Sequence, residues 1–208
     1  MVYLEPTTLG WRPLVKSWLH EFPKVVGEES IEYLGALFEW LVDPCLDFIR
    51  KSCKEYVQGS AANQTKSLMF LIDMLMHEGI HAEDAAENKH LKSWLVAAVL
   101  FAIPWSIGGC IDVDSRAKFD TFFRDLVAGK IETSPIPKEI GKVENMMPTD
   151  HPVYDFYYEQ KAKGQWNHWN VLLRGTEPKT TKIREMLVPT MDTARYTFIM
   201  DLCIHHNR

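Results

Sequence analysis

The chain has 208 residues, of which 46% are hydrophobic and 25% charged, an ordinary balance for a globular protein. Its formal net charge is −5, from 23 basic and 28 acidic residues, and no basic run stands out, so no nucleic acid partner is expected. The longest apolar run is shorter than a membrane span and contains a proline, so no membrane partner is expected either. The 4 cysteines have no CxxC spacing, which indicates no disulfide framework and fits a reducing compartment.

The first predicted element is a short helix that follows an extended start. Pro13 suits its first turn, and Pro23 ends it. Its apolar face is expected to consist of Leu14, Trp18 and Leu19.

Residues 28–57 show the clearest helical period, with apolar residues three and four positions apart. Ser30 is the expected N-cap of this helix. The pattern continues through Pro44, which predicts either one long kinked helix or two helices that meet there. The next helix is predicted over residues 64–78, with Gly79 as the residue that ends it.

The stretch from Leu91 to Arg124 organises the rest of the chain. Every position from Trp94 to Ile103 is apolar, so this helix must be buried on all sides. Pro104 is expected to stop or kink it, and the double glycine that follows lets the backbone turn sharply.

A second helix follows in this stretch, with Asp112 or Asp114 as its N-cap. Arg116 then falls in the first turn, where a cation opposes the helix dipole. An anion bound at the helix N-terminus would resolve this conflict. The alternative is an ordinary ion pair between Arg116 and Asp112, Asp114 or Asp120. The inward stripe of the helix is predicted to be Phe119, Phe122, Phe123 and Leu126.

Prolines and glycines interrupt every period between residues 129 and 152, which predicts a linker or a connection that follows the surface. A β-hairpin is predicted next, because aromatic and polar residues alternate on either side of the turn K-A-K-G: Tyr154, Phe156 and Tyr158 before it, Trp166 and His168 after it. The last element is a helix capped by Thr190 or Asp192, with an expected inward face of Tyr196, Ile199, Met200 and Cys203. This helix leads into nothing, so we expect the chain to be part of a longer protein.

The segment H-E-G-I-H, from His77 to His81, matches the HExxH pattern, in which two histidines hold zinc and Glu78 would be the general base. That chemistry needs a continuous helix, whereas Gly79 indicates a helix end inside the motif. No third ligand has a familiar spacing. A zinc peptidase is therefore an alternative, and no metal ligand is assigned.

Four segments, in this order, resemble a dynein heavy chain of the axonemal type. They are M-V-Y-L-E-P-T-T-L-G-W-R-P-L-V-K-S-W, W-S-I-G-G…D-S-R-x-K-F-D, H-P-V-Y-D-F-Y-Y…G-x-W-x-x-W and V-P-T-M-D-T-A-R-Y. The first resembles the segment after the sensor-1 strand of the second AAA+ module, and the second resembles the helical lid of that module. The other two resemble the start of the third module.

The resemblance implies a mainly α fold in three parts. A helical-bundle AAA+ lid would occupy residues 1–128, a linker residues 129–151, and the leading edge of the third module, a small β-hairpin and a C-terminal helix, residues 152–208. The chain would be a lid and inter-module linker of a dynein motor ring. It would contribute to ATP-dependent, minus-end-directed movement along microtubules and to ciliary movement. Without Walker A and Walker B segments it is not expected to hydrolyse ATP alone.

The resemblance also implies site residues and partners. Arg116 would be a sensor-2 arginine of the lid, and Val188, Pro189 and Thr190 would lie in the loop that passes the adenine of the third module's nucleotide. ATP or ADP with Mg²⁺ would be bound in the full-length motor. The partners would be the neighbouring AAA+ modules, the microtubule and the dynein intermediate and light chains, in the cytoskeleton of the cytoplasm, at the ciliary axoneme. A helical interaction scaffold without a nucleotide role is the second alternative.

Overall fold

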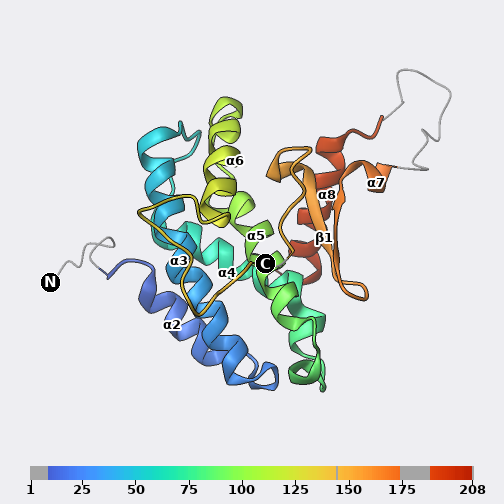
Figure 1. Ribbon diagram of the computed structural model, residues 1–208. Coiled ribbons are helices and arrows are strands. Elements are labelled where there is room, and N and C mark those ends of the chain that lie inside the picture. Colours follow the sequence, from blue (N-terminus) through green and yellow to red (C-terminus); the bar gives the residue numbers. More distant parts are fainter. Residues whose placement is uncertain (1–8, 144, 174–187, 208) are drawn as a thin grey trace, which may run out of the picture.

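The computed structural model describes residues 9–143, 145–173 and 188–207 (Figure 1). Most of the extended start predicted before the first helix lies outside these residues. The fold is mainly α, as predicted. Its helices are α2 Arg12–Glu21, α3 Glu28–Ser52, α4 Ala61–Ile80, α5 Leu91–Ser106, α6 Val113–Val127, α7 Asn170–Leu173 and α8 Met191–His205. Its strands are β1 Phe156–Glu159 and β2 Gln165–His168, and short 3-10 turns occupy Lys24–Val26 (η1), Ala85–Glu87 (η2) and Val153–Asp155 (η3).

Helix α5 is the centre of the fold. Every residue from Leu95 to Ile103 is buried, and Trp94 is half-buried, because α3, α4 and β1 all pack against this helix. In Figure 1, α2, α3 and α6 lie to the left of α5, and the hairpin and α8 lie to its right. Pro104 does not stop the helix, which continues to Ser106. None of the described helices combines the length and apolar character that crossing a membrane requires.

The first three helices differ from the prediction in detail. Pro13 lies in the first turn of α2, as expected, but Leu14 is exposed and Val15 is the buried residue. Helix α3 runs unbroken through Pro44. It begins after Gly27, whose φ is 82°, so the predicted N-cap Ser30 instead lies buried inside its first turn.

Helix α4 is longer than predicted at both ends. Its N-cap is Ser60, whose side chain accepts a hydrogen bond from the amide of Asn63 (3.2 Å). The helix passes through Gly79 and ends at Ile80, so the prediction that Gly79 ends it is wrong. The physical reason is the backbone: Gly79 does not adopt the positive φ with which a glycine ends a helix, so the helix continues for one more residue. A Cβ on Gly79 would lie 3.4 Å from the Trp94 ring, an ordinary van der Waals distance.

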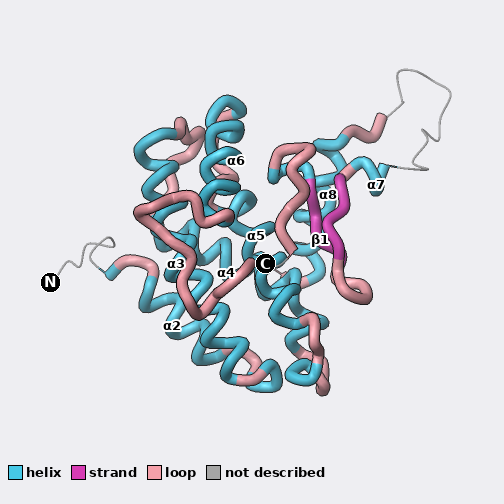
Figure 2. The backbone as a smooth tube through the Cα atoms, in the orientation of Figure 1, coloured by secondary structure: helices cyan, strands magenta, loops and turns pink. Residues whose placement is uncertain are grey.

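The connection from α6 to η3 contains no helix or strand among its described residues, and Figure 2 shows it as a loop that crosses in front of α3. Trp40 Nε1 of α3 donates to the carbonyl oxygen of Ser134 (3.3 Å). Ile140, Val143 and Met147 are buried in the same core as α5. The connection therefore follows the surface of the lid helices, while the boundaries at residues 128 and 151 stay a prediction.

The hairpin has the predicted position. The antiparallel strands pair Phe156 with His168 and Tyr158 with Trp166, and Gly164 in the turn has a φ of 77°. The prediction that Tyr154 belongs to the first strand is wrong, because Tyr154 lies in η3, which comes directly before β1.

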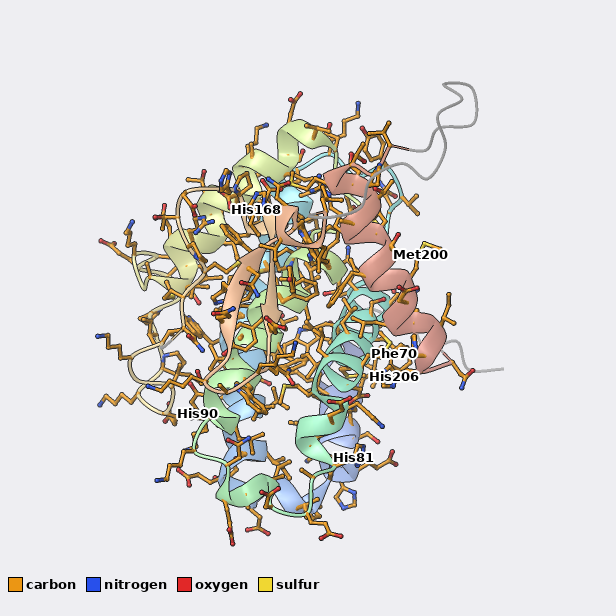
Figure 3. All side chains as sticks on the ribbon, turned by 90° about the vertical axis from the view of Figure 1, so that its right-hand side faces the viewer. Phe70, His81, His90, His168, Met200 and His206 are labelled. Carbon is orange, nitrogen blue, oxygen red and sulfur yellow. The ribbon has the colours of Figure 1, made fainter. Side chains whose placement is uncertain are left out.

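Helix α8 starts after Thr190, one of the two predicted N-caps, which forms a capping box with Thr193. Its orientation was predicted only in part. Ile199 and Cys203 are half-buried, but Tyr196 and Met200 are exposed, and Met200 points away from the molecule in Figure 3. Phe198 packs against Trp169 at 5.3 Å between ring centroids, and this contact sets the rotation of the helix.

Candidate functional site

A hollow of about 560 Å³ lies at the N-terminus of α6, between this helix, η3 and α8. We call it the arginine hollow, because Arg116 and Arg195 both line it. Asp112 caps α6 by accepting a hydrogen bond from the Ser115 amide (2.8 Å), and hydrogen bonds from Ser115 hold the pKa of this carboxyl below its ordinary value. The cap fixes the first turn of α6, and with it the position of Arg116.

Arg116 does not pair with the carboxylates that the sequence offered as partners. Asp112 is the cap, and Asp120 accepts hydrogen bonds from Arg124 Nε (3.1 Å) and the Val153 amide (2.7 Å). Within the described residues, Arg116 makes no ion pair with an aspartate, and its buried Nε has no hydrogen-bond partner. A guanidinium whose Nε is buried, and which has no carboxylate partner among the described residues, can accept an anion.

The ring of Tyr154 packs against the guanidinium of Arg116. The guanidinium carbon of Arg116 lies 5.1 Å from the centroid of the Tyr154 ring, a cation–π contact. The Tyr154 hydroxyl donates to the carbonyl oxygen of Gly108 (3.1 Å), and burial raises the pKa of this hydroxyl well above its ordinary value. A Cβ on Gly108 would come within 2.6 Å of the same hydroxyl, so Gly108 makes room for Tyr154.

Arg195 of α8 brings a second guanidinium to the arginine hollow. It is held by Asp192 (2.6 Å) and by Asp155 (3.5 Å), its side chain is 11% exposed, and its Nε is buried without a partner. The two carboxylates offset its charge, so Arg116 is the stronger candidate for an anion. Sequence reasoning missed Tyr154 and Arg195 as site residues, because only the tertiary fold brings them beside Arg116.

The predicted residues Val188, Pro189 and Thr190 lie on the other side of α8. Val188 and Pro189 line a separate hollow of about 440 Å³, which we call the apolar hollow, together with Leu172 and Leu173. Thr190 is the N-cap of α8 and does not line it. This surface suits a flat apolar group.

The two hollows share α8 as a wall. Asp192, Arg195 and Tyr196 face the arginine hollow. Thr193, Ala194 and Thr197 face the apolar hollow. The structure therefore does not gather the predicted site residues into one pocket: Arg116 lines one hollow, and Val188 and Pro189 line another on the opposite face of α8.

The HExxH segment lies at the end of α4, with His81 as the C-cap. The rings of His77 and His81 are 4.7 Å apart and line a hollow of about 620 Å³ that His206 also reaches. Glu78 lines a different hollow, beside Trp94. Among the described residues, no third ligand atom approaches the two histidines closely enough to complete a metal site. A general base that faces away from the histidines does not fit a zinc peptidase.

Comparison with known proteins gives consistent matches. The family model "Dynein heavy chain AAA lid domain" matches residues 34–171. Dynein axonemal heavy chain 12 of Rattus norvegicus is 39% identical over 213 residues, which cover 99% of this chain and 7% of the relative. Dynein axonemal heavy chain 3 of Homo sapiens is 36% identical over 217 residues, which cover 99% of this chain and 5% of the relative. The chain thus spans well under a tenth of the length of these curated relatives.

Proposed function

The chain belongs to the family of dynein heavy chain AAA lid domains, and from this premise we propose that it is the lid of the second AAA+ module of a dynein motor ring, joined to the start of the third module. Its partners are then the neighbouring modules of the same heavy chain. The shared core of the lid helices and the connection supports this role, because a lid that carries its connection with it can pass a rigid-body movement to the next module.

The observation that best supports a nucleotide role is the lack of a carboxylate partner for Arg116 among the described residues. A guanidinium at the start of a helix, with a buried Nε and no carboxylate partner among the described residues, is suited to phosphate oxygens. We assign it to the phosphate of the nucleotide at the second module. Tyr154 would hold the guanidinium in place through the cation–π contact.

The apolar hollow supports an assignment at the third module. Val188 and Pro189 offer an apolar surface of the kind that an adenine ring packs against, and Thr190 fixes their position by starting α8. ATP or ADP with Mg²⁺ would be held mainly by other parts of the heavy chain. This chain contributes one wall to each of the two sites.

The names of the relatives also suggest where in the cell the protein acts. Both of the relatives described above are axonemal dynein heavy chains, so we place this chain in the ciliary axoneme, in a motor that moves along microtubules. Contacts with the microtubule and with dynein intermediate and light chains would be made elsewhere in the heavy chain.

The test is nucleotide affinity at the second module of the full heavy chain. Arg116→Ala should weaken ATP binding there about tenfold to a hundredfold, because a hydrogen bond to a charged group contributes about 1.5–3 kcal/mol. Lys118→Ala is the matched control: it removes a cation from the same helix, but Lys118 does not line the arginine hollow. Equal affinity in the Arg116→Ala and Lys118→Ala heavy chains would refute the phosphate assignment.

A further inference from the structure

We propose that His151, Asp155 and His168 form a binding site for a divalent transition-metal ion, with zinc as the best match, where the connection meets the hairpin. Their ligand atoms all lie within 4.8 Å of one another. Two imidazoles and one carboxylate are a donor set that zinc takes in proteins, with a water molecule at the fourth position. The proposal does not rest on the nucleotide role, although Asp155 also lines the arginine hollow and pairs there with Arg195.

The backbone under these three residues is fixed from several sides. Arg124 Nη2 donates to the carbonyl oxygen of His151 (2.6 Å), and Asp120 accepts from the amide of Val153 (2.7 Å). The amide of Trp169 donates to the carbonyl oxygen of Asp155 (3.1 Å). The first two bonds hold the connection against α6. The third holds η3 against the residue that follows β2. The ligand residues are thus brought together by the fold before an ion arrives, which lowers the entropic cost of binding.

The side chains already face one another. The rings of His151 and His168 are 4.5 Å apart between centroids, and both lie against Phe156, at 6.2 Å and 5.8 Å. Asp155 is 14% exposed, whereas His151 is 50% exposed. Tetrahedral zinc with bonds of about 2.0–2.1 Å needs ligand atoms about 3.4 Å apart. The half-exposed His151 can supply this small movement by turning its side chain.

Charges and hydrogen bonds around the site set the expected affinity. Asp150, with Oδ2 3.9 Å from His151 Nε2, adds negative charge and favours a cation. Arg195 lies 3.5 Å from Asp155, and its positive charge disfavours a bound cation. The amide of Asn170 donates to His168 Nδ1 (3.1 Å), and this bond is lost whichever ring nitrogen binds the metal, because Nδ1 then carries either the ion or a proton. We therefore expect a micromolar rather than a tighter dissociation constant.

The site is separate from the histidines of the HExxH segment. His168 lies in the upper part of the molecule in Figure 3, whereas His206 lies lower, at the end of α8, and His81 lower still, at the end of α4. This separation gives the experiment an internal control, since His77→Ala removes an imidazole from the lower group alone.

The test is a zinc titration of the metal-free chain in competition with a chromophoric chelator. The unchanged chain should bind one zinc ion, and His151→Ala and His168→Ala should each weaken binding at least tenfold, while His77→Ala should leave it unchanged. Zinc should also raise the melting temperature of the unchanged chain but not that of His151→Ala, which loses only a half-exposed side chain and should keep its fold. Unchanged affinity in His151→Ala, or a loss in His77→Ala, would overturn the proposal.

Discussion

Asp120 is the residue whose removal tests most directly how the connection is held to the lid. Its Oδ1 accepts hydrogen bonds from Arg124 Nε (3.1 Å) and from the amide of Val153 (2.7 Å). Asp120→Ala removes both bonds and leaves the Arg124 guanidinium without its carboxylate. The same guanidinium holds the carbonyl oxygen of His151, so the substitution weakens two attachments of the connection at once.

The expected cost follows from burial. A hydrogen bond to a charged group contributes about 1.5–3 kcal/mol when it is shielded from water. Asp120 and Arg124 are 20% and 21% exposed, so solvent weakens both interactions only in part. We expect Asp120→Ala to lower the free energy of unfolding by about 2 kcal/mol. For a chain of this length that is a fall of about 4–8 °C in melting temperature. Asp120→Asn keeps an acceptor but loses the charge, and should cost about half as much.

Circular dichroism during thermal and urea unfolding measures both variants, and Asp47→Ala provides the control. Asp47 also contacts two cations, Arg50 and Lys51, but it lies on the surface of α3 and is 50% exposed. Its removal should cost less than about 1 kcal/mol. If Asp47→Ala and Asp120→Ala destabilise the chain equally, partial burial of the Asp120 pair is not what holds the connection, and the reasoning fails.

Two further predictions concern the hairpin turn and a buried thiol. Gly164→Ala should destabilise the chain by about 1–3 kcal/mol in urea, because φ is 77° and the new Cβ would lie 2.0 Å from the Tyr158 hydroxyl; Gly141→Ala, with a φ of 63° and open space, should cost less, and equal costs would rule out the clash. Burial raises the pKa of Cys45, so the native thiol keeps its proton where an unfolded thiol with a pKa of about 8.5 loses it. The free energy of unfolding should therefore fall as pH rises above about 8.5, and less steeply in Cys45→Ala. Identical slopes from pH 7.5 to 9.5 would contradict this.

Local sequence patterns predicted the main elements where one physical factor dominates. The unbroken apolar run from Trp94 to Ile103 predicted a surrounded helix, and every one of its residues except the half-buried Trp94 is buried. The alternation on either side of K-A-K-G predicted the hairpin, and the structure pairs Tyr158 with Trp166 across it. The Thr190 cap was identifiable because a short hydroxyl side chain at that place satisfies a free backbone amide.

The errors arose where several faces of a helix are apolar. In α8 the predicted stripe included Met200, but the tertiary contact between Phe198 and Trp169 turns a different side inward. At Gly79 a general rule for helix ends failed, because this glycine keeps the helical backbone and the helix ends one residue later, at Ile80. Periodicity shows that a helix has an inward face, whereas its neighbours decide which face that is.

The candidate site was predicted in the same partial way. Arg116 stood out because a cation in the first turn of a helix needs an explanation, and no carboxylate of the described residues pairs with it. No local pattern marks Tyr154 or Arg195 as its neighbours. His151 and His168 likewise belong to separate segments, and only the pairing of β1 with β2 and the path of the connection bring them together.

The position of α8 between the arginine hollow and the apolar hollow has a mechanical consequence. Residues on opposite sides of one helix cannot move independently, because the backbone hydrogen bonds of its 15 residues keep it rigid. A sideways displacement of α8 that narrows one hollow must widen the other by a comparable amount. The widths of the arginine hollow and the apolar hollow are therefore inversely coupled through α8.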